Sequence, residues 1–523
     1  MPDTPLVQGQ VRSRWSTVLA FAVVVFAAAA GVGTVLLLLV DNQIDVRPNV
    51  AVNPPGIVDA NNSPAARTNP ADADNVVVVS RQDAPEYSAG LHWTQDGGVT
   101  WRTRELPLPR GKDRPFAPDA AFAPDGTLYV SYVNLTGAGN TPENLWLARS
   151  DDGGRTLSDP VRVAGALAFQ ARLAVAPDGT VHLVWLQADE VALLSLPEPA
   201  PIVSARSTDA GATFSRPVRV SDPERQRVGA ATPVVDAEGD LLVVYVDFKG
   251  NRRDFLNLEG PPTNEPAALV LTESQDGGRS FSPGVEVEDG LVISRRFLVF
   301  LPEFPGLATG AHGSLYVVWD DARNGDRDVF LRRSNDGGST WTDRVRVNDN
   351  AVGDGTAQYL PQVAVAPNGR VDVVFLDRRH DPDDVRTDAY LGFSQDQGRS
   401  FRNVRVSADS FDSRIGSSAA SHLPPDLGSR LGLVSWEDRV LAVWADTRLG
   451  TVDTKRQDIV AGHVDLPDVV LLGRLRRLVV LSVLVALAAL GLWALIRRRG
   501  GAGVPGDTRS EMTDMTASGT GGS

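Results

Sequence analysis

The sequence of 523 residues predicts an all-β protein, a propeller of seven four-stranded blades that lies between two transmembrane helices. Three observations lead to this prediction. An eight-residue turn pattern occurs six times, a pair of β-branched strands occurs seven times, and a long apolar run lies near each end of the chain. Repetition at intervals of roughly 60 residues is typical of a fold built from equivalent units that pack against their neighbours.

The first apolar run covers residues 17–40 and carries no charge. It is long enough to cross a bilayer as a helix and longer than the apolar part of a usual signal peptide. Arg12 and Arg14 precede the run and Asp41 follows it, so the positive-inside rule places residues 1–16 in the cytoplasm. A cleaved signal peptide is the alternative interpretation of this run.

The second apolar run covers residues 478–496, and arginines flank it on both sides. Its length without a polar face predicts a second transmembrane helix. Residues 497–523 are rich in Gly, Ser and Thr, which is typical of a disordered tail. We therefore expect a cell-membrane protein with both termini in the cytoplasm and the domain between the helices outside it.

The repeated turn pattern is Ser/Thr-x-Asp-x-Gly-x-Thr/Ser-aromatic, and the copy from Ser334 to Trp341 shows it clearly. An Asp carboxylate can accept backbone N–H bonds across a tight hairpin, and Gly adopts positive φ without a Cβ clash. The final aromatic residue, replaced by Leu157 in one copy, can then anchor the turn in the core. The aspartates of the six copies are Asp96, Asp152, Asp209, Asp276, Asp336 and Asp396.

This pattern resembles the Asp box, or BNR repeat, of the sialidase-like β-propellers. In that family the box is the hairpin between the third and fourth strands of a blade, remote from the active site. The resemblance therefore implies that the six aspartates are structural. A group that recurs in almost every repeat serves the repeat rather than one site.

A strand pair precedes each Asp box, as in Val363 to Phe375, where alternating apolar residues flank a Pro-Asn-Gly turn. There are seven such pairs but six boxes, so the last blade lacks a fourth strand. Residues 45–52 fit the missing strand and would close the ring beside residues 457–464. The propeller then covers residues 44–465, and a six-bladed alternative holds only if residues 62–94 form no blade.

The long loops all fall on one rim of the predicted propeller. Turns between the first and second strands and between the third and fourth are uniformly short. The insertions at 134–143, 187–201, 248–266, 288–304 and 407–430 lie in the other set of connections, on the opposite rim. Long, irregular loops on a rigid scaffold tend to carry function, so we expect the ligand there.

Three arginines on this rim, Arg323, Arg379 and Arg448, follow the second strands of successive blades. They are similar to the arginine triad with which sialidases hold a carboxylate, for which guanidinium geometry is suited. Each is also accompanied by an aspartate at the head of the following strand. A salt bridge to that aspartate is the favoured interpretation.

The sialidase resemblance also implies an acidic acid/base and a Tyr nucleophile paired with a Glu. Candidates on the long-loop rim are Glu303 and Tyr359 for catalysis and Arg172, His422 and Asp426 for the ligand-binding face. The family's Arg-Ile-Pro stretch is missing from this sequence, which leaves it uncertain whether the chain is an enzyme.

Composition excludes several other functions. A formal charge of −14 argues against nucleic-acid binding, and the lack of cysteine excludes thiolate catalysis. No phosphate-binding loop or zinc-protease motif occurs, so we expect no cofactor and no metal site. The acidic string at 380–384 could hold calcium through oxygen ligands, although a solvated loop explains it equally well.

These observations predict a membrane-anchored, extracytoplasmic Asp-box propeller that binds a glycan or a protein at the cell envelope. The alternative is an exo-α-sialidase-type retaining glycoside hydrolase. The residues themselves identify neither the ligand nor the oligomeric state.

Overall fold

The structure, a computed structural model, describes residues 44–491 except for a set of short gaps. The gaps are 57–58, 138, 191–197, 257–264, 294–302, 417–426, 467–479, 482–483, 486 and 489–490. The chain divides into two compact units, one of residues 44–469 and one of residues 1–43 and 470–523.

The two apolar runs belong to the second unit. The predicted helix at 17–40 and the tails at 1–16 and 497–523 lie outside the described residues, as does most of 478–496. Within the described part of the chain, no helix is both long and apolar enough to cross a membrane.

Residues 44–469 form seven antiparallel sheets, and in six of them the four main strands follow chain order. Blade 1 consists of β3 (Asn61–Asn69), β4 (Asp72–Gln82), β5 (Ser88–Thr94) and β6 (Arg102–Glu105). Blade 2 consists of β7 (Pro115–Phe122), β8 (Leu128–Thr136), β9 (Thr141–Ser150) and β10 (Val161–Ala164). Blade 3 consists of β11 (Ala168–Val175), β12 (Val181–Gln187), β13 (Ile202–Ser207) and β14 (Val218–Arg219).

The next three blades repeat this order. Blade 4 consists of β15 (Val228–Val235), β16 (Leu241–Asp247), β17 (Pro266–Ser274) and β18 (Val285–Val292), with the short helix α2 (Arg252–Phe255) between β16 and β17. Blade 5 consists of β19 (Gly306–Thr309), β20 (Leu315–Asp321), β21 (Asp328–Ser334) and β22 (Val345–Arg346), with a 3-10 turn at Ala311–Gly313. Blade 6 consists of β23 (Gln358–Val365), β24 (Val371–Asp377), β25 (Arg386–Ser394) and β26 (Arg402–Arg405), with β27 (Phe411–Asp412) also paired to β25.

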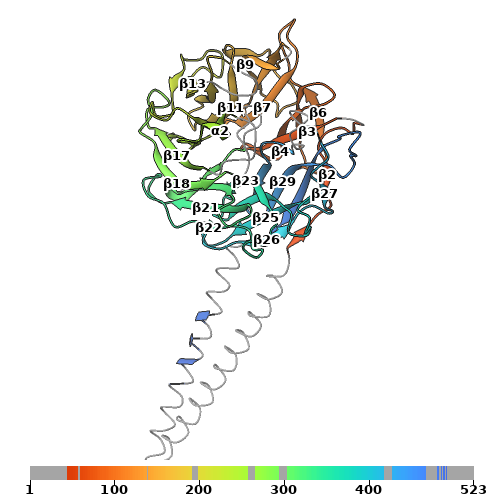
Figure 1. Ribbon diagram of the computed structural model, residues 1–523, viewed down its shortest axis with the longest axis vertical. Helices are drawn as coiled ribbons and strands as arrows, with labels where there is room; N and C mark the ends of the chain where they lie inside the picture. The colour runs from red at the N-terminus through yellow and green to blue at the C-terminus, as the bar shows by residue number, and fades with distance from the viewer. Residues whose placement is uncertain are drawn as a thin grey trace, which may run out of the picture. The chain divides into compact units, whose positions relative to one another are not determined.

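Blade 7 joins the two ends of the propeller. It consists of β28 (Gly432–Ser435), β29 (Arg439–Asp446) and β30 (Asp458–Asp465), and β30 pairs with both β1 (Asp45–Val46) and β2 (Val50–Ala51). Figure 1 looks onto the ring, with first strands such as β7, β11 and β23 near its centre and fourth strands such as β18, β22 and β26 outside. The seven-bladed prediction is confirmed, and the six-bladed alternative is wrong because residues 61–94 supply three strands of blade 1.

The N-terminal segment closes the ring as the strand count predicts. Asp45 lies opposite Asp465 and Val50 lies opposite Ala461, both in antiparallel register. The Arg47 guanidinium donates two hydrogen bonds of 2.7 Å to the Asp465 carboxylate. The closing strand is two short segments rather than one, and Pro48, which has no N–H for the ladder, lies between them.

Each Asp box is a hairpin between a third and a fourth strand. In the fifth blade, Asp336 Oδ1 accepts the Thr340 N–H at 2.8 Å and the Ser334 hydroxyl at 2.7 Å. The Ser334 hydroxyl oxygen in turn accepts the Gly338 N–H at 2.8 Å. The bond from the fourth residue after the aspartate recurs in all six boxes at 2.8 to 3.0 Å. The carboxylates thus hold backbone donors of their own turns.

The boxes also fasten neighbouring blades together. The second glycine of a box lies against the preceding blade, so that a Cβ on Gly338 would lie 2.3 Å from Leu271 and one on Gly98 would lie 3.1 Å from His463. His463, on β30, makes a 2.8 Å hydrogen bond to the Gly97 carbonyl of blade 1. A side chain at these glycines would push the blades apart.

Candidate ligand-binding site

The innermost strands of five blades share a distortion on the long-loop side. Ser63, Ala117, Gln170, Ala230 and Leu360 have φ between 49° and 58°, and the strand register shifts at each of them. A residue with a side chain seldom adopts positive φ within a strand, and such bulges redirect the side chains beside them. The distortions therefore form a ring around the centre of the propeller.

Three arginines converge on one carboxylate below this ring. Arg172 Nε lies 3.0 Å from Asp119 Oδ2, while Arg67 Nη2 and Arg430 Nη1 lie 3.4 Å and 3.7 Å from Asp119 Oδ1. The four residues come from blades 3, 2 and 1 and from the connection that enters blade 7. The cluster therefore exists only when the ring is closed.

The cluster is buried and carries excess positive charge. The side chains of Asp119, Arg172 and Arg430 are 1%, 5% and 7% exposed. Burial opposes ionisation of Asp119, but Arg172, Arg430 and Arg67 outweigh it and lower its pKa to about 2. Burial and the neighbouring Arg172 lower the pKa of Arg430 to about 9, which reflects the cost of a second buried cation.

Arg81, next to the cluster, is matched by its own carboxylate. Its Nε lies 3.1 Å from Asp83 Oδ1, and both side chains are less than 10% exposed. With this pair included, four guanidinium groups face two carboxylates among the described residues of the centre. Arg172 Nη1 is buried and has no hydrogen-bond partner in the described part of the chain. An unpaired buried cationic donor is costly, so the geometry favours a bound anion.

A cavity of about 40 Å³ opens beside these arginines. Arg81 and Arg430 line it together with three aromatic rings, those of Phe116, Phe169 and Phe304. The Arg172 guanidinium lies over the ring of Phe304, a lining residue of the cavity, at 4.7 Å. A volume of this size holds a few water molecules, so it suits one small anionic group rather than a whole sugar ring.

Glu303 and Tyr359, predicted as catalytic candidates, meet at one arginine. Arg327 Nη2 lies 2.7 Å from Glu303 Oε2, and the Arg327 guanidinium lies 4.9 Å from the centre of the Tyr359 ring. Asp320 Oδ2 lies 2.5 Å from the same Arg327 nitrogen. Burial of the Asp320 carboxyl raises its pKa to about 6. The Tyr359 hydroxyl lies 3.3 Å from Arg378 Nη2, so the ring is held between two guanidinium groups.

The arginines Arg323, Arg379 and Arg448 each bind a carboxylate of their own blade, and Arg323 also binds Glu288 of blade 4 at 2.6 Å. The prediction that each arginine pairs with the aspartate at the head of the following strand is wrong. Each guanidinium instead binds the aspartate two residues before it. Arg323 binds Asp321 at 2.5 Å, and the pairs Arg379 with Asp377 and Arg448 with Asp446 follow at 2.7 Å and 2.9 Å. The same carboxylates accept the arginines' own backbone N–H groups at 2.8 to 3.0 Å.

The remaining predicted residues divide between the centre and the gaps. Arg172 belongs to the central cluster, whereas His422 and Asp426 lie outside the described residues. The sequence argument missed Arg67, Asp119 and Arg430. Arg67 and Asp119 are charged residues within innermost strands, and that was the available signal for them.

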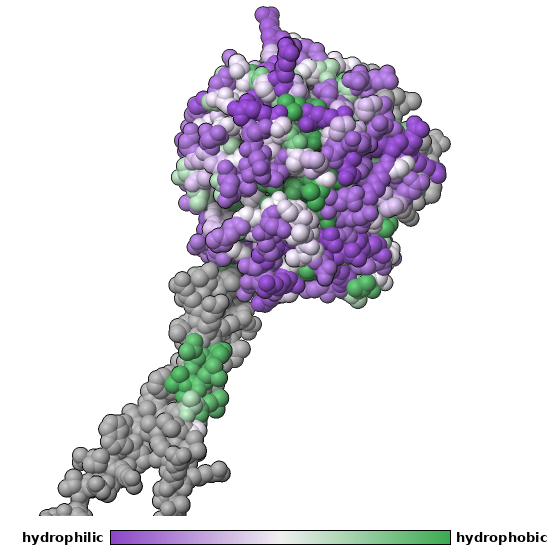
Figure 2. All heavy atoms as spheres, turned by 90° about the vertical axis from the view of Figure 1, so that its left-hand side faces the viewer, coloured by the Kyte–Doolittle hydropathy of each residue, from purple (hydrophilic) through white to green (hydrophobic). Residues whose placement is uncertain are grey.

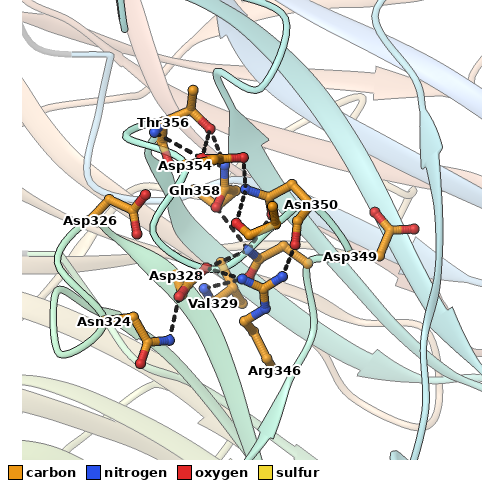
Figure 3. A network of polar contacts seen from close by, with 12 residues as sticks. Asn324, Asp326, Asp328, Val329, Arg346, Asp349, Asn350, Asp354, Thr356 and Gln358 are labelled. Atoms are coloured by element: carbon orange, nitrogen blue, oxygen red, sulfur yellow. Dashed lines mark hydrogen bonds and ion pairs between the residues drawn. The ribbon is translucent and has the colours of Figure 1, made fainter. Parts of the chain in front are cut away.

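The acidic loops on this rim are engaged by nitrogen donors. Figure 3 shows one of them, where Asn324 donates to Asp328 at 2.6 Å and Asn350 donates to Asp354 at 2.8 Å. The Asn348 amide also donates to Asp328 at 2.6 Å and to Gln358 at 2.8 Å. In the string at 380–384, Asp381 accepts the Val385 and Arg386 N–H groups. Among the described residues, no group of three or more His, Asp or Glu side chains is placed to hold a metal ion.

The sequence matches no protein-family model, and it matches no curated protein. Similar solved structures include a Dyadobacter fermentans protein of unknown function, at 14% identity and a TM-score of 0.45, covering 81% of this chain and all of the other. An α-L-arabinofuranosidase from Fusarium graminearum shows 17% identity and a TM-score of 0.43, with coverage of 69% and 96%. A Hadza microbial sialidase shows 15% identity and a TM-score of 0.42, with coverage of 76% and 75%. At these scores the likeness carries no information on activity or ligand.

Proposed function

We propose that this chain is a membrane-anchored, extracytoplasmic propeller that binds an acidic glycan, whose anionic group enters the central cavity. The observation that carries the proposal is the buried excess of positive charge around Asp119, where Arg67, Arg172 and Arg430 share one carboxylate. An anion beside Arg172 Nη1 would supply the missing partner and relieve the repulsion between the guanidinium groups.

The net charge of the chain, its surface and its apolar runs also bear on the proposal. The chain carries a formal charge of −14, so long-range attraction of polyanions does not explain an arginine cluster at its centre. Figure 2 shows the outer edge of the propeller at the left of Figure 1, which is mostly hydrophilic with scattered apolar patches. Membrane anchoring rests on the two apolar runs of the sequence.

Isothermal titration calorimetry tests the proposal on the full-length chain purified in detergent. We expect glucuronate to bind and glucose, which lacks the carboxylate, not to bind. Arg172→Lys keeps the charge but loses the planar fork, so it should weaken glucuronate binding by roughly tenfold or more. Arg430→Gln should do the same.

A matched control removes an arginine on the same rim. Arg414 is 69% exposed and pairs with Asp412. Arg414→Gln therefore changes the total charge by the same amount as Arg430→Gln without altering the centre. Circular dichroism establishes that each variant is folded. Equal binding of glucose and glucuronate, or unchanged binding in both central variants, would refute the proposal.

Hydrolysis is the second candidate function, and the meeting of Glu303 and Tyr359 at Arg327 supports it. Retaining sialidase-type chemistry uses a tyrosine activated by a neighbouring carboxylate. The same preparation should be incubated with a fluorogenic sialoside. Turnover that is lost in Tyr359→Phe would make the chain an enzyme, and no turnover would leave it a binding protein.

A further inference from the structure

A broad groove lies beside the central cavity, between blades 1 and 2. Its volume is about 1040 Å³, at the upper end of the range for ligand sites. One wall is the loop from Gln82 to Ser88, between β4 and β5, and the other is the connection at 105–115 that joins β6 to β7. Asn140, in the turn between β8 and β9, belongs to the lining as well.

The groove and the cavity are neighbours along three separate stretches of backbone. Arg81 lines the cavity and the next residue, Gln82, lines the groove. In the same way Phe116 lines the cavity and Pro115 lines the groove, and Pro142 and Asn140 lie on either side of the same boundary. A ligand held in the cavity therefore has the groove as its nearest open space.

An aromatic pair forms the wall between the two hollows. Tyr87 lines the groove, Phe116 lines the cavity, and their rings meet edge to face with centroids 5.4 Å apart. Tyr87 is half-buried, so part of its side chain is open to the groove that it lines. A ring of this kind offers an apolar platform and a hydrogen-bonding group at low entropic cost, as sugar rings require.

The charge of the groove differs from that of the cavity. Glu86, Glu105 and Asp113 line it together with Lys112 and Arg114, which leaves a formal charge of −1 among the described lining residues. Lys112 is paired with Glu143, and Arg114 donates to Asn140 Oδ1 at 2.8 Å. The groove therefore has no excess cation for a second acidic group, while its prolines and carboxylates suit neutral rings with hydroxyl groups.

We propose that this groove is a subsite for neutral sugar residues, so that the ligand is an oligosaccharide with its acidic residue at one end. The terminal acid occupies the cavity, and the adjoining neutral residues lie over Tyr87 between blades 1 and 2. This inference rests on the proposed function, because the anion sets the position from which the chain runs into the groove. Tyr87 determines preference for chain length rather than for charge.

Calorimetry with three probes tests the subsite on the full-length chain in detergent. The probes are glucuronate, glucuronate linked to xylobiose, and xylotriose. We expect the linked acid to bind at least tenfold more tightly than glucuronate, and xylotriose to bind far more weakly than the linked acid. Tyr87→Ala should remove most of that tenfold gain and leave the affinity for free glucuronate unchanged, while Tyr87→Phe, which keeps the ring, should retain most of it.

Trp93 provides the matched control. It is a half-buried aromatic residue of β5, the strand that follows Tyr87, and it lies at the end that enters the Asp box. Trp93→Ala should leave the affinities for all three probes unchanged. The subsite is refuted if the linked acid binds no better than glucuronate, if Tyr87→Ala weakens both equally, or if the Trp93 and Tyr87 variants behave alike. Failure of every acid to bind would instead refute the proposed function.

Discussion

A single methyl group on Gly338 tests whether the Asp boxes hold the blades together. In Gly338→Ala the new Cβ would lie 2.3 Å from Leu271 Cδ2, on β17 of the preceding blade, and 3.4 Å from Leu315 Cδ1 of its own blade. Real Cβ atoms essentially never approach another heavy atom within 3.0 Å, so the two blades must separate or the Leu271 side chain must move.

The neighbouring glycine isolates the backbone contribution. Gly337 has φ +66° and Gly338 has φ +91°, but a Cβ on Gly337 meets no heavy atom within 4 Å. A left-handed non-glycine residue costs about 1 to 2 kcal/mol, and the reduced freedom of the unfolded chain returns about 0.4 to 1 kcal/mol. Gly337→Ala should therefore lower the free energy of unfolding by about 1 kcal/mol.

Overpacking adds to this cost at Gly338. Inserting a methyl group into a well-packed core costs about 1 to 3 kcal/mol, so Gly338→Ala should lower the free energy of unfolding by about 2 to 4 kcal/mol. Urea unfolding followed by tryptophan fluorescence measures both variants against the parent protein. Gly338→Ala combined with Leu271→Ala should destabilise the protein by less than the sum of the two single variants, because the leucine truncation removes the clashing methyl groups. Equal destabilisation by the two glycine variants would refute contact between blades as the role of the box.

Two further predictions concern pH and the membrane. Both ring nitrogens of the buried His182 have no hydrogen-bond partner among the described residues, and burial lowers its pKa to about 4. Because this pKa lies below the unfolded value, stability is fully present above about pH 6.5 and falls as the pH drops toward 4. The loss reaches about 3 kcal/mol there, and His182→Leu should reduce the slope of urea midpoint against pH between these values. The full-length chain should stay in the membrane pellet after an alkaline carbonate wash. Because the chain has no native cysteine, Arg414→Cys introduces a single thiol, which should react with an impermeant thiol reagent on intact cells. Labelling only after lysis would contradict an extracytoplasmic propeller.

The architecture was predictable because its signals are local. An Asp box contains both the donors and the acceptor of its turn, as the bonds among Ser334, Asp336 and Thr340 show, so each copy is recognisable within eight residues. Ring closure needed only a count, since seven strand pairs and six boxes left β30 with an unpaired edge. The pairing of Asp45 with Asp465 across the whole chain follows from that count.

The partners of the rim arginines could not be chosen from spacing alone. Each arginine has an aspartate two residues before it and another at the head of the next strand, and both lie within side-chain reach. The nearer carboxylate is favoured because it also accepts the arginine's backbone N–H, as Asp377 does for Arg379 at 2.8 Å. Two of the farther aspartates pair with arginines from fourth strands, Asp328 with Arg346 at 3.1 Å and Asp388 with Arg405 at 2.6 Å, whereas Asp458 pairs with Arg456 at 2.8 Å. The backbone contact, which is invisible in the sequence, decides between the two.

Most of the central cluster escaped prediction for a different reason. The residues at the five bulges are of four different types, so no motif marks these positions in the sequence. They are Ser63, Ala117, Gln170, Ala230 and Leu360. At two of the bulges the backbone N–H bonds to the preceding blade, where Ala230 donates to Gln170 Oε1 at 2.8 Å and Leu360 donates to Asp320 Oδ1 at 3.2 Å. The strain at these two bulges is therefore offset by a bond to the neighbouring blade. Charges placed on such strands are fixed by neighbours on both sides, which is how three guanidinium groups can be held around one carboxylate with a donor left over for a ligand.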